Sequence, residues 1–229
     1  MILTLAEWEV LLLSLKIASV AIFVSLPLAV AVAWLLARGN FWGKSLFDSI
    51  IHLPLVLPPV ALGYLLLILM GKKGIIGQWL YQLFGISFSF NWQGAALASA
   101  IVAFPLVVRS IRLAIESIDM RLENVAKTLG AGKWRVFFSI TLPLAFPGIL
   151  MGLVLGFARC LGEFGATITF VSNIQGETRT IPLAMYTLLQ TPNGEHAAMR
   201  LCIISIVLAL IALIISEWLN RWHKKKLAG

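Results

Sequence analysis

Five long runs of apolar residues limit what this chain can fold into more than any other feature of its sequence. Each run is close to or longer than the roughly 20 residues that a helix needs to cross a bilayer. Apolar residues make up 60% of the 229-residue chain and charged residues only 12%, whereas soluble domains carry about 25% charged residues. The sequence therefore predicts an all-α integral membrane protein. The five expected spans are Val10–Ala37, Ser49–Met70, Phe88–Val108, Leu142–Phe170 and Ala197–Trp218.

The apolar segment Ile75–Phe84 is too short to be a sixth span. Its Trp79 and Tyr81 are typical of the membrane–water interface, so we expect a helix that lies in the interface there. The sequence shows no internal repeat and no separate soluble domain. One membrane domain is therefore expected over residues 10–219.

The positions of the basic residues predict which ends of the spans face the cytoplasm. Cytoplasmic loops retain Lys and Arg, and one orientation places twelve basic residues inside and three outside. The N-terminus is then outside, and residues 220–229 form a basic cytoplasmic tail. Because these charges flank the spans, they explain the net charge of +8 without nucleic-acid binding. The inside set is Arg38, Lys44, Arg109, Arg112, Arg121, Lys127, Lys133, Arg135, Arg221, Lys224, Lys225 and Lys226, and the outside set is Lys72, Lys73 and Arg179.

A polar segment, Asp119–Pro143, separates the third and fourth expected spans and falls on the cytoplasmic side. Four of its residues recur at i, i+3, i+4 and i+7, the spacing of one face of a helix. Gly130 and Gly132 then end this helix, and a second apolar stripe follows. Helices this short are marginal alone, so we expect them to need a docking surface. The stripes are Leu122, Val125, Ala126 and Leu129, then Trp134, Phe137 and Phe138.

The chain shows no site for binding ATP and no motif for enzyme chemistry. Gly43–Ser45 reads G-K-S, but a phosphate-binding loop needs a glycine five residues earlier, where this chain has Arg38. The three histidines are scattered, and no zinc or nucleophile motif is present. We therefore expect no catalytic residue, metal or cofactor on this chain, and any energy for its work comes from a partner.

Two charges lie deep within the fourth expected span, where burying a charge is costly. Arg159 and Glu163 are four residues apart and share one helical face. They either form a self-compensating structural pair, or Arg159 attracts an anion on a translocation path. Thr167 and Thr169 follow them and suit either close helix packing or a polar pore lining. The sequence leaves both interpretations open.

Proline interrupts the second expected span at Pro54, Pro58 and Pro59. Each proline removes a backbone hydrogen bond, and neighbouring groups must compensate for it inside the membrane. Broken helices are common where transporters bind or gate, although simple kinks have the same sequence pattern.

The polar segment resembles the cytoplasmic loop of type-1 ABC-transporter permeases, whose signature is E-A-A-x-x-x-G-x9-I-x-L-P. The first two signature positions, E and A, are occupied by Asn124 and Val125 in this chain. Glu123 lies one residue before the position where the signature has its glutamate. The resemblance implies a type-1 permease fold and assigns residues 119–141 as a coupling loop. In that family the loop forms short helices that fit a cleft in a separate cytoplasmic ATPase. The implied coupling residues are Glu123, Ala126, Gly130, Ala131, Ile140, Leu142 and Pro143.

A narrower resemblance covers nearly the whole chain and points to the molybdate permease subunits of this family. It rests on D-S-I-I-H-L-P-L-V-L-P-P, R-L-E-N-V-A-K-T-L-G-A-G-K-W-R-V-F-F, A-R-C-L-G-E-F-G-A-T-I-T-F-V-S-N-I and G-E-T-R-T-I-P. It implies a homodimer in the bacterial inner membrane, two copies of an ATPase, and a periplasmic protein that delivers molybdate or tungstate.

Two other functions stay open at this point. The run A-R-x-L-G-E-F-G-A is shared in part with sulfate permeases, so a sulfate or thiosulfate permease is the first alternative. A membrane assembly subunit that has no pore is the second, because composition and spacing alone do not require a pore.

Overall fold

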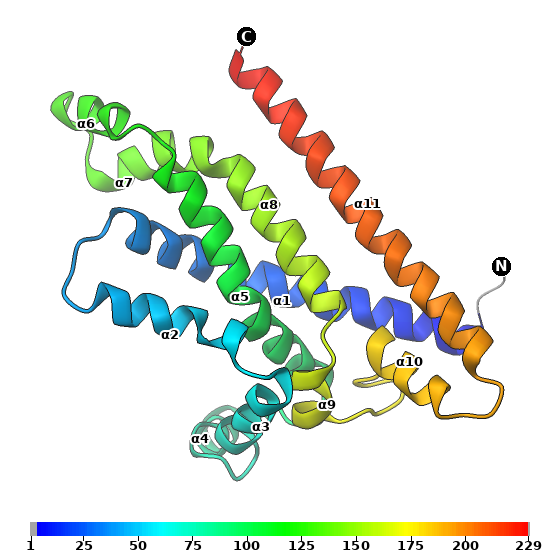
Figure 1. The fold of residues 1–229 in the computed structure, drawn as a ribbon. Coiled ribbons are helices and arrows are strands. Elements are labelled where there is room, and N and C mark those ends of the chain that lie inside the picture. The colour runs from blue at the N-terminus through cyan, green and yellow to red at the C-terminus, as the bar shows by residue number, and fades with distance from the viewer. Residues whose placement is uncertain (1–3, 229) are drawn as a thin grey trace.

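A computed structural model describes residues 4–228, and every regular element in that part of the chain is a helix (Figure 1). Among these residues, four single helices are long and apolar enough to cross a membrane, and one bent pair adds a fifth candidate span. The expected all-α membrane protein is confirmed. The helices are α1 (Leu5–Arg38), α2 (Lys44–Val56), α3 (Pro59–Met70), α4 (Ile75–Phe84), α5 (Trp92–Glu116), α6 (Met120–Thr128), α7 (Lys133–Val136), η1 (Phe137–Thr141, a π-helical turn), α8 (Leu142–Leu161), α9 (Gly165–Val171), α10 (Ile181–Leu189) and α11 (Glu195–Ala228).

The centre of the molecule is formed by α1, α5 and α8, which pack on one another (Figure 1). Small residues at the contacts let the helix backbones approach closely, which is how membrane helices gain packing energy without water to exclude. Gly156 of α8 lies against Ile22 of α1 and Val107 of α5, so all three helices meet at this position.

The second expected span, Ser49–Met70, is divided into two helices. α2 ends at Val56, α3 begins at Pro59, and the two helices are bent by 113°. Pro58 and Pro59 cannot donate the backbone hydrogen bonds that would continue α2, which accounts for the break. The short helix expected over Ile75–Phe84 is present as α4, with the same bounds.

The fourth expected span, Leu142–Phe170, differs at both ends. Its continuous helical segment begins earlier, at Lys133, and ends at Leu161. A break over residues 162–164 separates it from α9. This break meets the first one, because Gly165 at the start of α9 lies against Pro59 at the start of α3. Two interrupted helices therefore contact each other at their interruptions.

The third and fifth expected spans correspond to α5 and α11, with shifted ends. α5 begins at Trp92 because the side chain of Asn91 accepts a hydrogen bond from the Gly94 N–H and caps the helix. It continues past Val108 to Glu116, where an ion pair with Arg112 supports its last turn. The backbone of the expected tail extends α11 to Ala228, but the side chains of residues 219–229 lie outside the described part.

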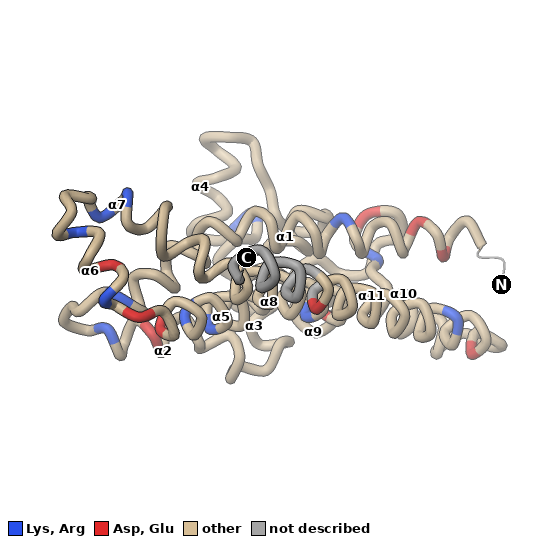
Figure 2. The backbone as a smooth tube through the Cα atoms, turned by 90° about the horizontal axis from the view of Figure 1, so that it is seen from above, with Lys and Arg blue, Asp and Glu red and all other residues tan. Residues whose placement is uncertain are grey.

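Charged residues gather at the two ends of the molecule and are sparse between them (Figure 2). Lys and Arg are concentrated around α6 and α7, at the end that the sequence places in the cytoplasm. An apolar middle between two charged ends is the arrangement that a bilayer requires.

The contact between α3 and α9 generates a prediction about stability. A Cβ at Gly63 would overlap Thr169 Oγ1 and the backbone of Ala166, so Gly63→Ala forces the two helices apart. We expect this overpacking to lower the free energy of unfolding by about 1–3 kcal/mol, measured as a lower melting temperature of the purified protein in lipid nanodiscs. The control is Gly132→Ala, where an added Cβ meets open space. Equal melting temperatures for the two variants would contradict the close contact.

Candidate functional site

The helix α6 buries its carboxylate and exposes its apolar residues. Among its nine residues, all of them described, Glu123 alone is buried, at 5% exposure. Leu122 next to it is exposed, and Leu129, just past the end of the helix, is 84% exposed. Because helices normally turn such residues inward, this inversion indicates a surface for another protein. We call the exposed apolar residues of this loop the docking face: Met120, Leu122, Val125, Leu129, Trp134 and Phe138.

The turn after α6 gives a physical reason for the spacing between Ala126 and Gly130. Gly130 has a φ of +86°, a left-handed conformation that glycine adopts without strain. Its N–H donates to Lys127 O at 3.0 Å, and the N–H of Ala131 donates to Ala126 O at 3.0 Å. Together these two bonds form a Schellman motif, which ends the helix. Three of the predicted coupling residues therefore shape this turn.

The remaining coupling residues, Ile140, Leu142 and Pro143, lie where the loop returns to the membrane. The helix widens there into the π-turn η1, in which the Leu142 N–H donates to Phe137 O, five residues earlier. Proline lacks an N–H and its ring crowds the carbonyl four residues before it. A wider turn immediately before Pro143 lets the helix pass through this proline without ending.

Aromatic rings fix the loop to α1. The ring of Trp34 in α1 stacks on Trp134 with centroids 6.0 Å apart, and meets the edge of Phe137 at 5.3 Å. Phe137 is buried, whereas Trp134 and its neighbour Phe138 stay exposed. The second apolar stripe is therefore divided in two. Phe137 anchors the loop, and Trp134 and Phe138 extend the docking face.

The structure brings Arg159 and Glu163 together at the break between α8 and α9. Arg159 Nη1 lies 2.7 Å from Glu163 Oε2, as an ion pair without hydrogen-bond alignment. The other oxygen, Oε1, accepts the Ala166 N–H at 2.8 Å and so caps the start of α9. Glu163 is 2% exposed, but the Arg159 side chain is 31% exposed. The pair thus compensates a buried carboxylate while the arginine side chain stays partly exposed.

Thr167 and Thr169, which the sequence placed on the candidate translocation path, form hydrogen bonds beside this break. Thr167 is fully buried, and its hydroxyl donates to Phe164 O at 2.9 Å. The hydroxyl of Thr169 donates to Gly165 O at 2.9 Å, and it also lies 3.4 Å from Val60 O of α3. By donating to backbone carbonyls, both hydroxyls are satisfied within the protein, as a membrane interior requires.

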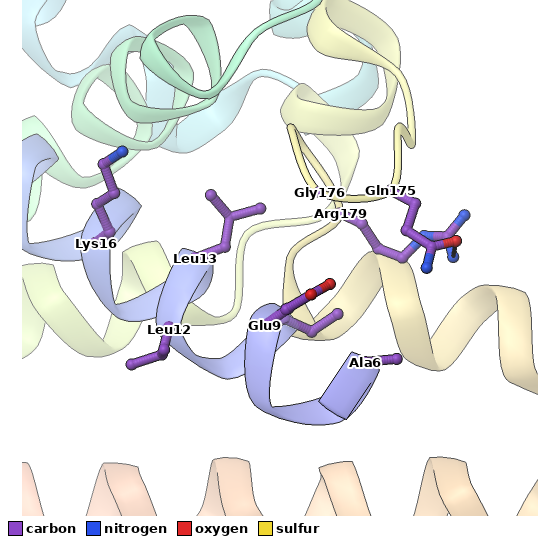
Figure 3. Close-up of a pocket in the computed structure, with 9 residues that line it drawn as sticks. Ala6, Glu9, Leu12, Leu13, Lys16, Gln175, Gly176 and Arg179 are labelled. Carbon is purple, nitrogen blue, oxygen red and sulfur yellow. Dashed lines mark hydrogen bonds between the residues drawn. The ribbon is translucent and has the colours of Figure 1, made fainter. Parts of the chain in front are cut away.

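A cavity of about 410 Å³ opens at the outer face, between the first turns of α1 and the loop 172–180 (Figure 3). Arg179 and Gln175 extend side by side at one end of it, and Lys16 lies at the other (Figure 3). Arg179 Nε donates to Asn173 Oδ1 at 2.9 Å, and Lys16 Nζ lies 3.7 Å from the centroid of a Trp92 ring. Sequence reasoning misses this cavity because its lining comes from segments far apart in the chain.

Two ion pairs that involve buried glutamates were also not predicted from the sequence. Arg38 pairs with Glu123 at 3.0 Å, and Arg200 pairs with Glu7 at 2.7 Å. Each pair joins segments from different parts of the chain. The one available signal is a charge at the edge of an apolar run, which shows that a partner is needed but does not identify it.

The family described as "Binding-protein-dependent transport system inner membrane component" matches residues 25–228. The chain belongs to this family. It is accordingly a multi-pass inner-membrane transport component, and its relatives are permease proteins, which are not themselves enzymes.

Known permease proteins are similar in sequence to this chain over almost its whole length. It is 65% identical to the molybdenum transport system permease protein ModB of Escherichia coli K12, over 99% of both chains. It is 66% identical to ModB of Haemophilus influenzae, over 94% of both chains. It is 34% identical to the sulfate transport system permease protein CysW of Synechocystis, over 91% of this chain and 76% of CysW.

The fold of the permease matches solved importers. It superposes on a chain of a bacterial alginate ABC transporter with a TM-score of 0.76, covering 95% of this chain and 79% of that one at 18% identity. At that identity the match establishes a shared type-1 importer fold.

The contacts of Glu163 at the break between α8 and α9 predict how its substitution changes the stability of the protein. Glu163→Ala removes both the ion pair and the cap of α9, whereas Glu163→Gln removes the charge but leaves an oxygen for the Ala166 N–H. We expect the alanine variant to melt lowest and the glutamine variant to lie between it and the wild type. Because Arg159 is partly exposed, the losses stay below the roughly 3–5 kcal/mol of a fully buried pair. Equal melting temperatures for the two variants would show that the cap contributes nothing.

Proposed function

We propose that this permease is the membrane subunit of an ATP-driven importer that carries molybdate, and also tungstate, across the inner membrane. The identity of 65% to a molybdenum permease over 99% of both chains supports molybdate. Sulfate or thiosulfate is the second candidate, and the 34% identity to a sulfate permease supports it less strongly. Membership of a transport family argues against an assembly subunit that has no pore.

The permease works with a binding protein outside and an ATPase inside, as a binding-protein-dependent component of an ABC importer. The number of copies of each subunit and the ligand of the binding protein are also proposed. Two copies of the permease form the channel, two copies of the ATPase bind below it, and a periplasmic protein delivers molybdate. Lipid covers the exposed apolar sides of the spans.

The docking face carries this proposal. It joins a helix that presents leucine and valine to the cytoplasm with two exposed aromatic rings, and aromatic residues are enriched at the apolar centre of protein interfaces. The chain has no phosphate-binding loop of its own, so the ATPase that binds here supplies the energy. Closure of the ATPase moves α6, and the membrane helices alternate between outward-facing and inward-facing forms.

We assign Arg159 the contact with the anion on its path. A dianion loses its hydration in the membrane, and an arginine at the break after α8 reduces that cost by charge and by planar hydrogen bonding to oxygens. Glu163 neutralises the arginine when no anion is present, so the pathway does not hold the anion too tightly. Thr167 and Thr169 keep the break beside Arg159 in place.

Reconstitution tests the function directly. Liposomes that contain the permease and its ATPase are supplied in turn with a molybdate-binding and a sulfate-binding protein, each loaded. We expect molybdate uptake and ATP hydrolysis to rise with the first protein only, and tungstate, but not sulfate, to compete. Uptake that depends on the sulfate-binding protein would overturn the substrate, and no uptake of any anion would overturn the transport function.

The docking face predicts the effect of a single charge. Val125→Glu places a carboxylate at the centre of the face, where binding would bury it unpaired. We expect binding of the ATPase to weaken at least tenfold, measured by copurification from detergent, while the permease still inserts. The control is Ile75→Glu, at an exposed apolar position on the outer helix α4. Unchanged copurification of the Val125 variant would place the ATPase elsewhere.

A further inference from the structure

The inner end of α1 is joined to the coupling loop by one buried carboxylate. Arg38 Nε donates to Glu123 Oε1 at 3.0 Å, and Arg38 Nη2 donates to Ile118 O at 3.1 Å. Thr141 Oγ1 donates to the same Glu123 oxygen at 3.2 Å. The side chains of Arg38 and Glu123 are 13% and 6% exposed, so water has little access to the pair. Glu123 thus connects α1, α6 and the π-turn before α8.

This junction is the main attachment of α6 to the body of the protein. Glu123 is the single buried residue of the helix, and the other eight residues are exposed or half-buried. Charge-assisted hydrogen bonds with several partners are strong and directional where water is excluded. The stack of Trp34 on Trp134 adds a second contact between α1 and the same loop. Any displacement of α6 therefore acts on the end of α1.

The outer end of α1 is joined to the other side of the molecule in the same way. Arg200 Nε of α11 donates to Glu7 Oε1 at 2.9 Å, and Glu7 is buried. The other oxygen of Glu7 accepts the Thr4 N–H at 2.8 Å, which completes the cap of α1. About two turns further along, Ser14 Oγ accepts the Ile181 N–H at 2.8 Å, in a buried bond to the start of α10.

Between these junctions α1 is one continuous helix. Its 34 residues span about 50 Å, and Pro27 does not interrupt it. α1 runs from the side that carries α6 and α7 to the side where α11 begins (Figure 1). α5 and α8 pack along it and limit its bending.

We propose that α1 is a positioning element that couples the ATPase-docking loop to the outer ends of α10 and α11, with Arg38–Glu123 as its inner junction and Glu7–Arg200 as its outer one. Movement of α6 by the ATPase shifts α1 along or about its axis, and the outer junction passes this shift to the surface that faces the periplasm. By the same path, a binding protein seated outside acts on the ATPase. This inference rests on the proposed importer function.

The test uses the reconstituted complex of permease, ATPase and loaded molybdate-binding protein. In Arg38→Gln we expect the ATPase to stay bound, because the docking face is unchanged. Stimulation of ATP hydrolysis by the binding protein falls at least about fivefold, the lower end of typical coupling between distant sites. Glu7→Gln at the opposite end gives the same result. The reciprocal double variant Arg38→Glu/Glu123→Arg restores part of the stimulation.

The matched control is Arg112→Gln, which removes a cytoplasmic arginine that pairs with Asp48 and Glu116 but not with α1. It should leave stimulation unchanged. The proposal is overturned if Arg38→Gln and Glu7→Gln keep full stimulation, if Arg38→Gln releases the ATPase, or if all three variants lose stimulation in proportion to their melting temperatures. Failure of the wild-type complex to respond to the binding protein would instead overturn the proposed function.

Discussion

Inside hydrocarbon, every polar group of a protein must find its partner within the protein, and this constraint determines the structure of the permease. It makes the spans helical, and it permits an interruption only where other groups satisfy the freed backbone. The two interruptions lie against each other at Pro59 and Gly165, and the Glu163 carboxylate accepts the backbone N–H of Ala166 at the start of α9. A transporter needs helices that can move relative to one another. The two breaks give it two interrupted helices that contact each other at their interruptions.

The same constraint governs the buried carboxylates. Glu7, Glu123 and Glu163 are each almost inaccessible, and each pairs with an arginine. Only the Arg159–Glu163 pair lies within one turn of helix, so only this pair could be predicted from spacing. The other two depend on how α1 crosses the bundle, and no local pattern in the sequence records that crossing.

Hydropathy and basic residues were sufficient to predict the membrane class, most of the spans and the short helix α4. They could not predict the 113° bend between α2 and α3, because prolines show where a helix stops but not the direction that follows. Periodicity found the apolar stripe of α6, and the structure showed that this stripe faces outward. The resemblance to the permease signature assigned Glu123 to the coupling loop without revealing that its side chain is buried.

The outward stripe of α6 also affects how the transporter is made. A permease that has inserted but has not met its ATPase exposes Leu122, Val125 and Leu129 to the cytosol, and chaperones and proteases recognise exposed apolar surface of this kind. In the proposed complex the ATPase covers this surface, so permease made in excess of its partner leaves the surface open to the cytosol.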